Sequence, residues 1–234
     1  MMNDTTEKIN SDVWRQEVFS AYFEGREYAD KHKLPLIFVG YSLGGLLGID
    51  LMEVALRRQP QFRRFDKMVL LAPALRLRWH ASLIKLLYFV GGEVMLPSLA
   101  PVYYRAKDAT SINAYKAIWN LLDGIERPLS DFDNSGVSCQ VPVLVVMDSQ
   151  DELVDYGAIK NFINKYGGQC DWRLQEIGDL SFYLPRELKS SQSRRKIHHL
   201  IIDPNSFRTA QSFDLMMSNV LIFLNSKLQD KQKR

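Results

Sequence analysis

Residues Leu34–Gly45 read LPLIFVGYSLGG, an apolar run of strand length followed by a Gly-Tyr-Ser-Leu-Gly pentad, and helix-compatible residues continue to Leu56. This pattern predicts a strand, a sharp turn and a helix, with Ser42 at the apex of the turn. Glycines two positions before and after the serine let strand and helix approach closely around a strained residue. A hydroxyl held in this way, with a base in reach, becomes a nucleophile. The alternative is an incidental serine in a Gly-rich turn.

Four short apolar segments alternate with helical patterns along the chain. Besides Leu36–Val39, the expected strands are Lys67–Leu71, Val141–Met147 and Asp171–Ile177. Helices are expected over Asp12–Lys31, with Ser11 or Asp12 as the cap, after Ser42, and over Phe207–Leu228. Continuous Val/Leu-rich strands that alternate with helices predict an α/β fold, a mostly parallel sheet covered by helices on both faces.

The segment between the second and third strands is long. It contains helix-like stretches at Ser82–Phe89 and Ser111–Leu122 and many apolar residues. We interpret residues 75–140 as a helical cap insertion, and residues 1–74 and 141–234 as the core domain. An ordinary connecting helix with loops is the alternative, but the segment is long for that.

Composition excludes several classes of protein. The chain has 234 residues, a net charge of +3 and two cysteines. The charge is too small and too dispersed for nucleic-acid binding, and Cys139 and Cys170 do not suggest a disulfide framework. The polar start carries no secretory segment, and the apolar stretch Ala81–Tyr104 is interrupted by charges and prolines. We therefore expect a cytoplasmic protein without a transmembrane segment.

An activated serine needs a general base, and the base needs a carboxylate that fixes its tautomer. Where a serine stands on this type of turn, the acid follows it in the chain and the histidine comes last. The third strand leads into a loop with Asp148, Asp151 and Asp155. Asp155 is placed to cap the next helix and Asp148 to shape the turn, so Asp151 is the preferred acid.

The chain has four histidines. His32 is expected at the surface end of a helix, and His80 lies in the insertion, before the acid. His198 and His199 come after the acid and ahead of the last helix, in the required chain order, so one of them is the expected base.

These residues resemble the α/β-hydrolase superfamily, particularly its capped carboxylesterases, monoacylglycerol lipases and lysophospholipases. The resemblance runs from about residue 12 to 226 and is most specific at Gly40–Gly45 and Val143–Asp155. Members often have an acidic residue a few positions after the histidine, and His198 with Asp203 fits that register better than His199. The resemblance implies ester hydrolysis through an acyl-enzyme, without a metal or organic cofactor. It also implies that the N–H of Leu43 serves in the oxyanion hole.

The sequence departs from the family before the elbow. Members have several strands and a His-Gly-type loop there, and that loop supplies the second oxyanion donor. Only 41 residues precede Ser42, and no His-Gly pair occurs in the chain. The fold is therefore expected to be N-terminally short, with Leu36–Val39 as an apolar sheet edge and self-association through it. A second departure is the long stretch Gly178–Lys196, in which Ser190–Ser193 is typical of a flexible loop.

The leading hypothesis is a serine hydrolase of the carboxylesterase or lipase type. Its substrate would be a small-molecule ester or lipid, because the insertion is rich in apolar residues such as Leu83, Leu86 and Phe89. A peptidase or thioesterase on the same scaffold is possible. Two other hypotheses are a catalytically impaired remnant that acts as a binding module or is inactive, suggested by the absent oxyanion loop, and a peripheral lipid-binding module.

Overall fold

The structure is a computed structural model that describes residues 9–55, 62–89, 93–97, 109–130, 140–167, 170–177, 197–202 and 210–226. Its main sheet has four parallel strands in the order β1-β2-β5-β6. They are β1 (Ile37–Tyr41), β2 (Lys67–Leu71), β5 (Val143–Asp148) and β6 (Trp172–Ile177). The four predicted strands are confirmed, with ends that differ by one or two residues.

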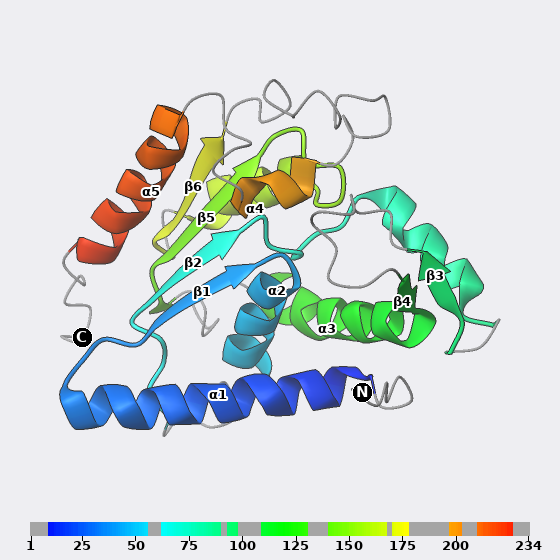
Figure 1. Cartoon of the computed structure of the whole chain (residues 1–234), viewed down its shortest axis with the longest axis horizontal. Coiled ribbons are helices and arrows are strands. Elements are labelled where there is room, and N and C mark those ends of the chain that lie inside the picture. Colours follow the sequence, from blue (N-terminus) through cyan, green and yellow to red (C-terminus); the bar gives the residue numbers. More distant parts are fainter. Residues whose placement is uncertain are drawn as a thin grey trace.

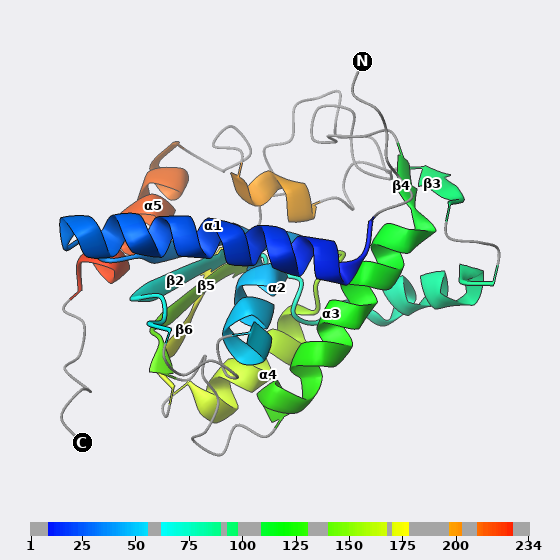
Figure 2. The same ribbon diagram turned by 90° about the horizontal axis from the view of Figure 1, so that it is seen from below.

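Helices cover both faces of this sheet (Figures 1 and 2). On one face lie α2 (Leu43–Asp50), α3 (Ile112–Ser130) and α4 (Tyr156–Tyr166). On the other lies α5 (Ala210–Asn225). The predicted class, a mostly parallel sheet between helices, is confirmed. None of the helices in the described ranges is long and apolar enough to cross a membrane.

The long helix α1 (Ser11–His32) packs against α2 and α3. Its cap is Asn10, whose side chain accepts hydrogen bonds from the N–H groups of Asp12 and Val13. The prediction of Ser11 or Asp12 as the cap was therefore wrong by one or two positions. Arg15 of α1 forms a bidentate ion pair with the buried Asp50 of α2, at 2.8 Å for both contacts. This pair fixes α1 to the elbow helix.

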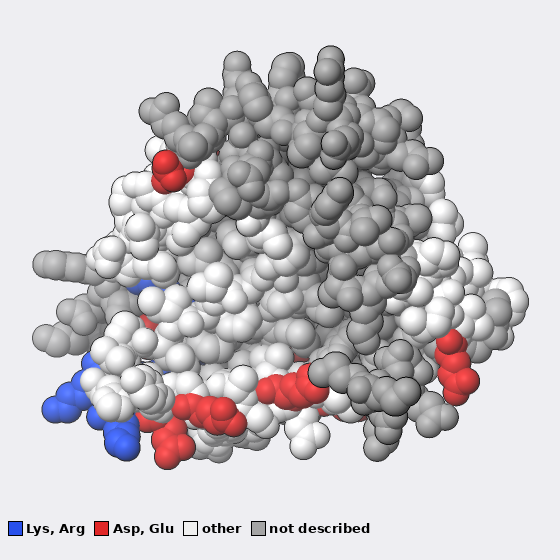
Figure 3. All heavy atoms as spheres, viewed as in Figure 1, with Lys and Arg blue, Asp and Glu red and all other residues white. Residues whose placement is uncertain are grey.

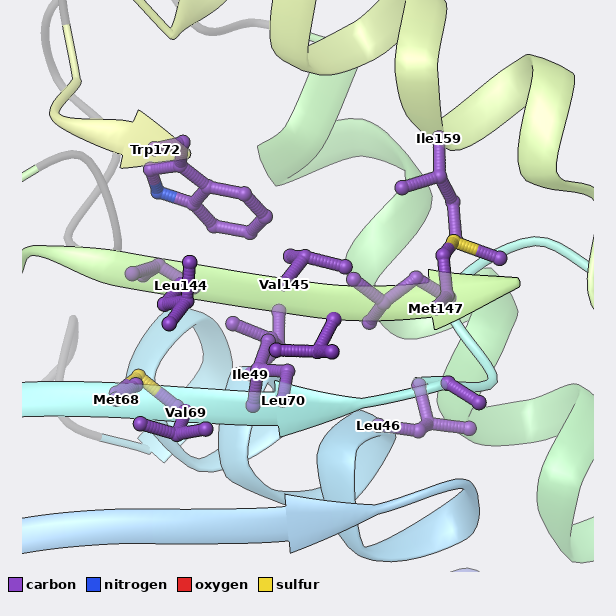
Figure 4. Close-up of a cluster of buried hydrophobic side chains, with 14 of the residues drawn as sticks. Leu46, Ile49, Met68, Val69, Leu70, Leu144, Val145, Met147, Ile159 and Trp172 are labelled. Carbon is purple, nitrogen blue, oxygen red and sulfur yellow. The ribbon is translucent and has the colours of Figure 1, made fainter. Parts of the chain in front are cut away.

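The core lies between the two central strands and the helices. Ile49 of α2 lies beside Leu70 and Val145 at the middle of the sheet, and Leu46 lies nearer the carboxyl end of β2 (Figure 4). All residues of β5 are buried, which explains why its sequence is continuously apolar up to Asp148 and not alternating. Trp172 of β6 is also buried. β5, which leads into the acid loop, is thus buried throughout, whereas β1, which leads into Ser42, is only partly buried.

The insertion between β2 and β5 contains more than helices. It begins with the 3-10 helix η4 (Trp79–Leu87) and includes an antiparallel pair, β3 (Met95–Pro97) with β4 (Ala109–Ser111). The helix α3, also in the insertion, packs on α1 and α2 and buries Leu121 and Ile125 in the core. Trp79, Leu86 and Phe89 of the η4 segment are exposed.

Two elements near the carboxyl terminus, η10 (Ile197–Ile202) and α5, are attached to the sheet. The short 3-10 helix η10 packs against β5, and α5 follows it in the chain. Lys67 of β2 is buried, and its ammonium group donates to the carbonyl oxygens of Phe223, Leu224 and Ser226 at the end of α5.

Cys170 is disulfide-bonded, which the cysteine count had not suggested. The predicted loop 178–196 lies outside the described residues.

Candidate active site

Ser42 stands between β1 and α2 in a strained backbone conformation. Its φ is 49° and its ψ −114°, a region that residues with a side chain rarely adopt. The surrounding structure holds it there: the Ser42 N–H donates to Leu71 of β2, and the Ser42 carbonyl accepts from Ala74 and Leu46. The hydroxyl is thereby presented at the carboxyl end of the sheet, as the sequence pattern predicts.

Glycines make this turn possible, although not all of those in the motif are needed for space. A Cβ at Gly40 would lie 2.8 Å from the backbone of Gly44 and Gly45, and one at Gly45 would lie 2.7 Å from Pro73. A Cβ at Gly44 would meet nothing within 4 Å. The close approach of strand and helix therefore depends on Gly40 and Gly45, and not on the glycine two residues after the serine.

The structure brings Ser42, His198 and Asp151 together in one hydrogen-bonded chain. His198 Nε2 lies 2.7 Å from Ser42 Oγ, and His198 Nδ1 lies 2.8 Å from Asp151 Oδ2. Because an ionised carboxylate only accepts, Nδ1 must carry the proton, which leaves Nε2 free to accept the serine proton. His198 and Asp151 are 2% and 1% exposed, so water does not compete for these bonds.

Asp151 is held from its own loop and from the start of the insertion. Its second carboxylate oxygen accepts hydrogen bonds from the N–H groups of Leu153 and Val154, both at 2.9 Å. Its carbonyl accepts from Arg78 Nε at 2.7 Å. Leu77 pairs with Val154 in a β-bridge, so the segment that leads into η4 is tied directly to the acid loop.

The other two aspartates of this loop have the structural roles that the sequence suggested. Asp155 caps α4 by accepting from the N–H of Ala158. Asp148 accepts from the N–H of Gln150 at 2.7 Å and so shapes the turn that leaves β5. Each forms a local turn or cap bond typical of aspartate.

The remaining histidines lie elsewhere. His32 is the last residue of α1, exposed and in contact with the Tyr28 ring. His80 is exposed on η4, beside Trp79. His199 follows His198 in η10, but its side chain, like Asp203, lies outside what the structure describes. The choice between His198 and His199 therefore rests on the bonds that His198 makes.

Leu43 is the first residue of α2, directly after the serine. The N–H groups of a helix's first turn have no partners within the helix, and they point toward the end at which Ser42 stands. Negative charge is favoured at such an end. This is the position from which a backbone N–H can stabilise an oxyanion.

Two site residues were not found from the sequence. Glu152 accepts a hydrogen bond from the His198 N–H at 3.1 Å, and Tyr41 donates one from its hydroxyl to the His198 carbonyl, also at 3.1 Å. Burial raises the pKa of Glu152. Burial, followed by the charges of Asp151 and Glu152, raises the pKa of Tyr41. The only available signal was adjacency, because Tyr41 precedes the serine and Glu152 follows the acid.

Comparison with known families identifies the class of protein. A family model described as serine aminopeptidase, S33 (Hydrolase_4) matches residues 19–180, which is more than half of the chain. The chain therefore belongs to this α/β-hydrolase family, as its elbow, parallel sheet and late histidine predict. No curated protein matches the sequence.

Solved structures with the same fold include a lipase and an esterase. A soluble variant of monoglyceride lipase from Saccharomyces cerevisiae, in complex with a substrate analog, aligns with a TM-score of 0.62 at 12% identity. The alignment covers 89% of this chain and 67% of the lipase. A thermostable carboxyl esterase from Bacillus coagulans, in complex with glycerol, aligns with a TM-score of 0.58 at 12% identity, over 92% of this chain and 72% of the esterase. At such identities the likeness shows the fold.

Proposed function

We propose that this protein is a serine hydrolase that cleaves carboxylic esters through an acyl-enzyme. The observation that carries the proposal is the continuous chain of hydrogen bonds from Ser42 Oγ through His198 to Asp151. Its order and geometry are those that nucleophilic acyl transfer requires.

In the proposed reaction, His198 Nε2 takes the Ser42 proton as the oxygen attacks the ester carbonyl. Asp151 holds the imidazole in its tautomer and stabilises the imidazolium that forms. The Leu43 N–H donates to the oxyanion at the N-terminal end of α2. His198 then protonates the departing alkoxide, and water attacks the acyl-enzyme with His198 as base, which returns Ser42 to its hydroxyl form.

Acyl-chain or monoglyceride-like esters are the proposed substrates. The η4 segment carries exposed apolar residues, and the chain just before it is joined to the acid loop through the pairing of Leu77 with Val154. An apolar surface on the segment that leaves the acid loop favours an acyl chain over a polar substrate. The yeast monoglyceride lipase and the Bacillus coagulans esterase, which share the fold, support the same class.

Labelling with a fluorophosphonate probe tests the nucleophile. The wild-type chain should be labelled, and Ser42→Ala should not. Ser82→Ala is a matched control, because the Ser82 hydroxyl only bonds locally to the carbonyl of Trp79. Equal labelling of wild type and Ser42→Ala would refute the assignment, and an unlabelled wild type would favour the impaired, non-catalytic remnant. Medium-chain p-nitrophenyl esters assayed beside aminoacyl p-nitroanilides then separate an esterase from an aminopeptidase.

A further inference from the structure

The base of the proposed triad stands on a short element. η10 is a 3-10 helix of six residues, and such helices have poor internal hydrogen-bond geometry. The side-chain bonds of His198 orient its ring, but they do not by themselves fix its main chain. Both peptide groups that flank its Cα are bonded to residues from other segments: the N–H to Glu152 and the carbonyl to Tyr41.

Each of the two partners is next in sequence to a residue of the proposed triad. Tyr41 is the residue before the nucleophile, at the end of β1, and Glu152 is the residue after the acid. A shift of His198 away from Ser42 therefore also strains its bond to Tyr41, and a shift away from Asp151 also strains its bond to Glu152. The rings of Tyr41 and His198 also lie side by side, with centroids 5.4 Å apart and planes at 32°.

These two bonds lie in a largely buried region. Burial is the main cause of the raised pKa values of Glu152 and Tyr41. The charged or titratable groups that face Glu152 are Asp151, His198 and Tyr41. In such an environment the loss of either bond costs more than the loss of a surface bond would.

We infer that Tyr41 and Glu152 are positioning residues that together hold the main chain of His198 at the correct distance from Ser42 and Asp151. The inference rests on the proposed function, since it assigns to these residues the alignment of its general base. Neither residue is required to touch the substrate. A misplacement of about 1 Å far from the bond that reacts can cost about 10²-fold in rate, so such a pair of anchors has a kinetic purpose.

Three variants separate the two bonds. Tyr41→Phe removes only the hydroxyl, and Glu152→Ala removes the acceptor. Glu152→Gln keeps an amide oxygen that can accept the His198 N–H, but it has no charge. Tyr22→Phe is the matched control, because the Tyr22 hydroxyl also donates to a backbone carbonyl, that of Arg63, at a distant place in the fold.

Two measurements are needed, one of which does not depend on turnover. Steady-state hydrolysis of a p-nitrophenyl ester should show kcat lowered about tenfold in Tyr41→Phe and in Glu152→Ala, with KM unchanged. Glu152→Gln should recover most of that loss, and Tyr22→Phe should equal the wild type. Proton NMR should show the His198 Nδ1–H far downfield in the wild type, identified by its loss in His198→Ala. That resonance should broaden or disappear in Tyr41→Phe and Glu152→Ala, and remain in the other two variants.

The outcomes distinguish this inference from the proposed function. If the wild type is inactive and unlabelled, but the resonance is lost in the two variants, the anchors are supported and the proposed function fails. If Tyr41→Phe and Glu152→Ala match Tyr22→Phe in both measurements, the inference is overturned while the function stands. A Glu152→Gln variant as impaired as Glu152→Ala would also overturn it, because charge and not hydrogen bonding would then explain the effect.

Discussion

At the scale of single residues, the two unusual features are the strained backbone of Ser42 and the buried pair of His198 and Asp151. Both features oppose stability taken alone, since a positive φ on a serine and two buried titratable groups each require compensation. The compensating interactions are the backbone hydrogen bond of Ser42 to β2 and the two hydrogen bonds that Asp151 accepts from backbone N–H groups. A local loss of stability at one point of a fold that is otherwise well packed is typical of a catalytic centre.

The roles of the base and the acid can be tested by single substitutions. We expect His198→Ala and Asp151→Asn each to lower kcat on a p-nitrophenyl ester by about 10³-fold or more, because the serine loses its base or the base loses its tautomer. Asp155→Asn is the matched control, since asparagine also caps helices. His199→Ala should be milder than His198→Ala. The opposite order would show that the two histidines exchange roles.

A pH dependence of stability follows from Glu152. Burial raises its pKa above the ordinary value of 4.5, so between the two values the folded state binds more protons than the unfolded chain. The stability contributed by this group therefore falls as pH rises through that interval. Glutamine has no charge to desolvate. The free energy of unfolding of wild type minus that of Glu152→Gln should accordingly be larger at about pH 4 than at about pH 7. Urea titrations at both pH values measure it, and an unchanged difference would contradict the raised pKa.

At the scale of elements, the sequence predicts the strands better than what surrounds them. β2 and β5 are recognisable because a parallel strand buried on both faces must be continuously apolar. The Asn10 cap was missed because three adjacent polar residues, Asn10, Ser11 and Asp12, can each act as a cap. The β3–β4 pair was missed because three-residue strands carry no usable periodicity. The anchors of His198 were missed because long-range bonds to a main chain leave no sequence pattern.

The contact between β2 and α5 offers a test at this scale. Lys67 satisfies carbonyl oxygens at the end of α5, three of which would lose a partner in Lys67→Met. We expect this variant to lower the free energy of unfolding by about 1–3 kcal/mol. Lys160→Met is the matched control, because the exposed Lys160 makes surface contacts alone, with Glu176 at 3.9 Å and with the Tyr156 ring, and its effect should stay within about 0.5 kcal/mol. Chemical denaturation compares them. A Lys67→Met variant as stable as the control would mean that water replaces the ammonium group.

At the scale of the whole molecule, β1 is the edge strand of the sheet within the described residues, as the sequence predicts. Leu36 and Ser42 direct their backbone groups toward β2, so the alternating residues Ile37 and Val39 direct theirs to the open side. The Val39 side chain is 61% exposed. In Figure 3, charged side chains gather along α1, and the described surface between α1 and α5 is almost free of them. Leu215, Leu221 and Ile222 of α5 are also exposed.

Such an edge lacks the devices by which soluble proteins prevent strand pairing, since residues 37–41 include neither charge nor proline. We therefore expect the isolated chain to self-associate, or to be poorly soluble, at micromolar concentration. Sedimentation velocity measures the association. Val39→Lys should shift the distribution toward monomer, because a lysine on an edge strand opposes pairing, and its exposure makes the substitution nearly neutral for folding. Gln16→Lys on the exposed face of α1 adds the same single charge and is the matched control. A wild type that sediments as a monomer and unfolds cooperatively would contradict the expectation, and it would mean that residues before β1 shield the edge.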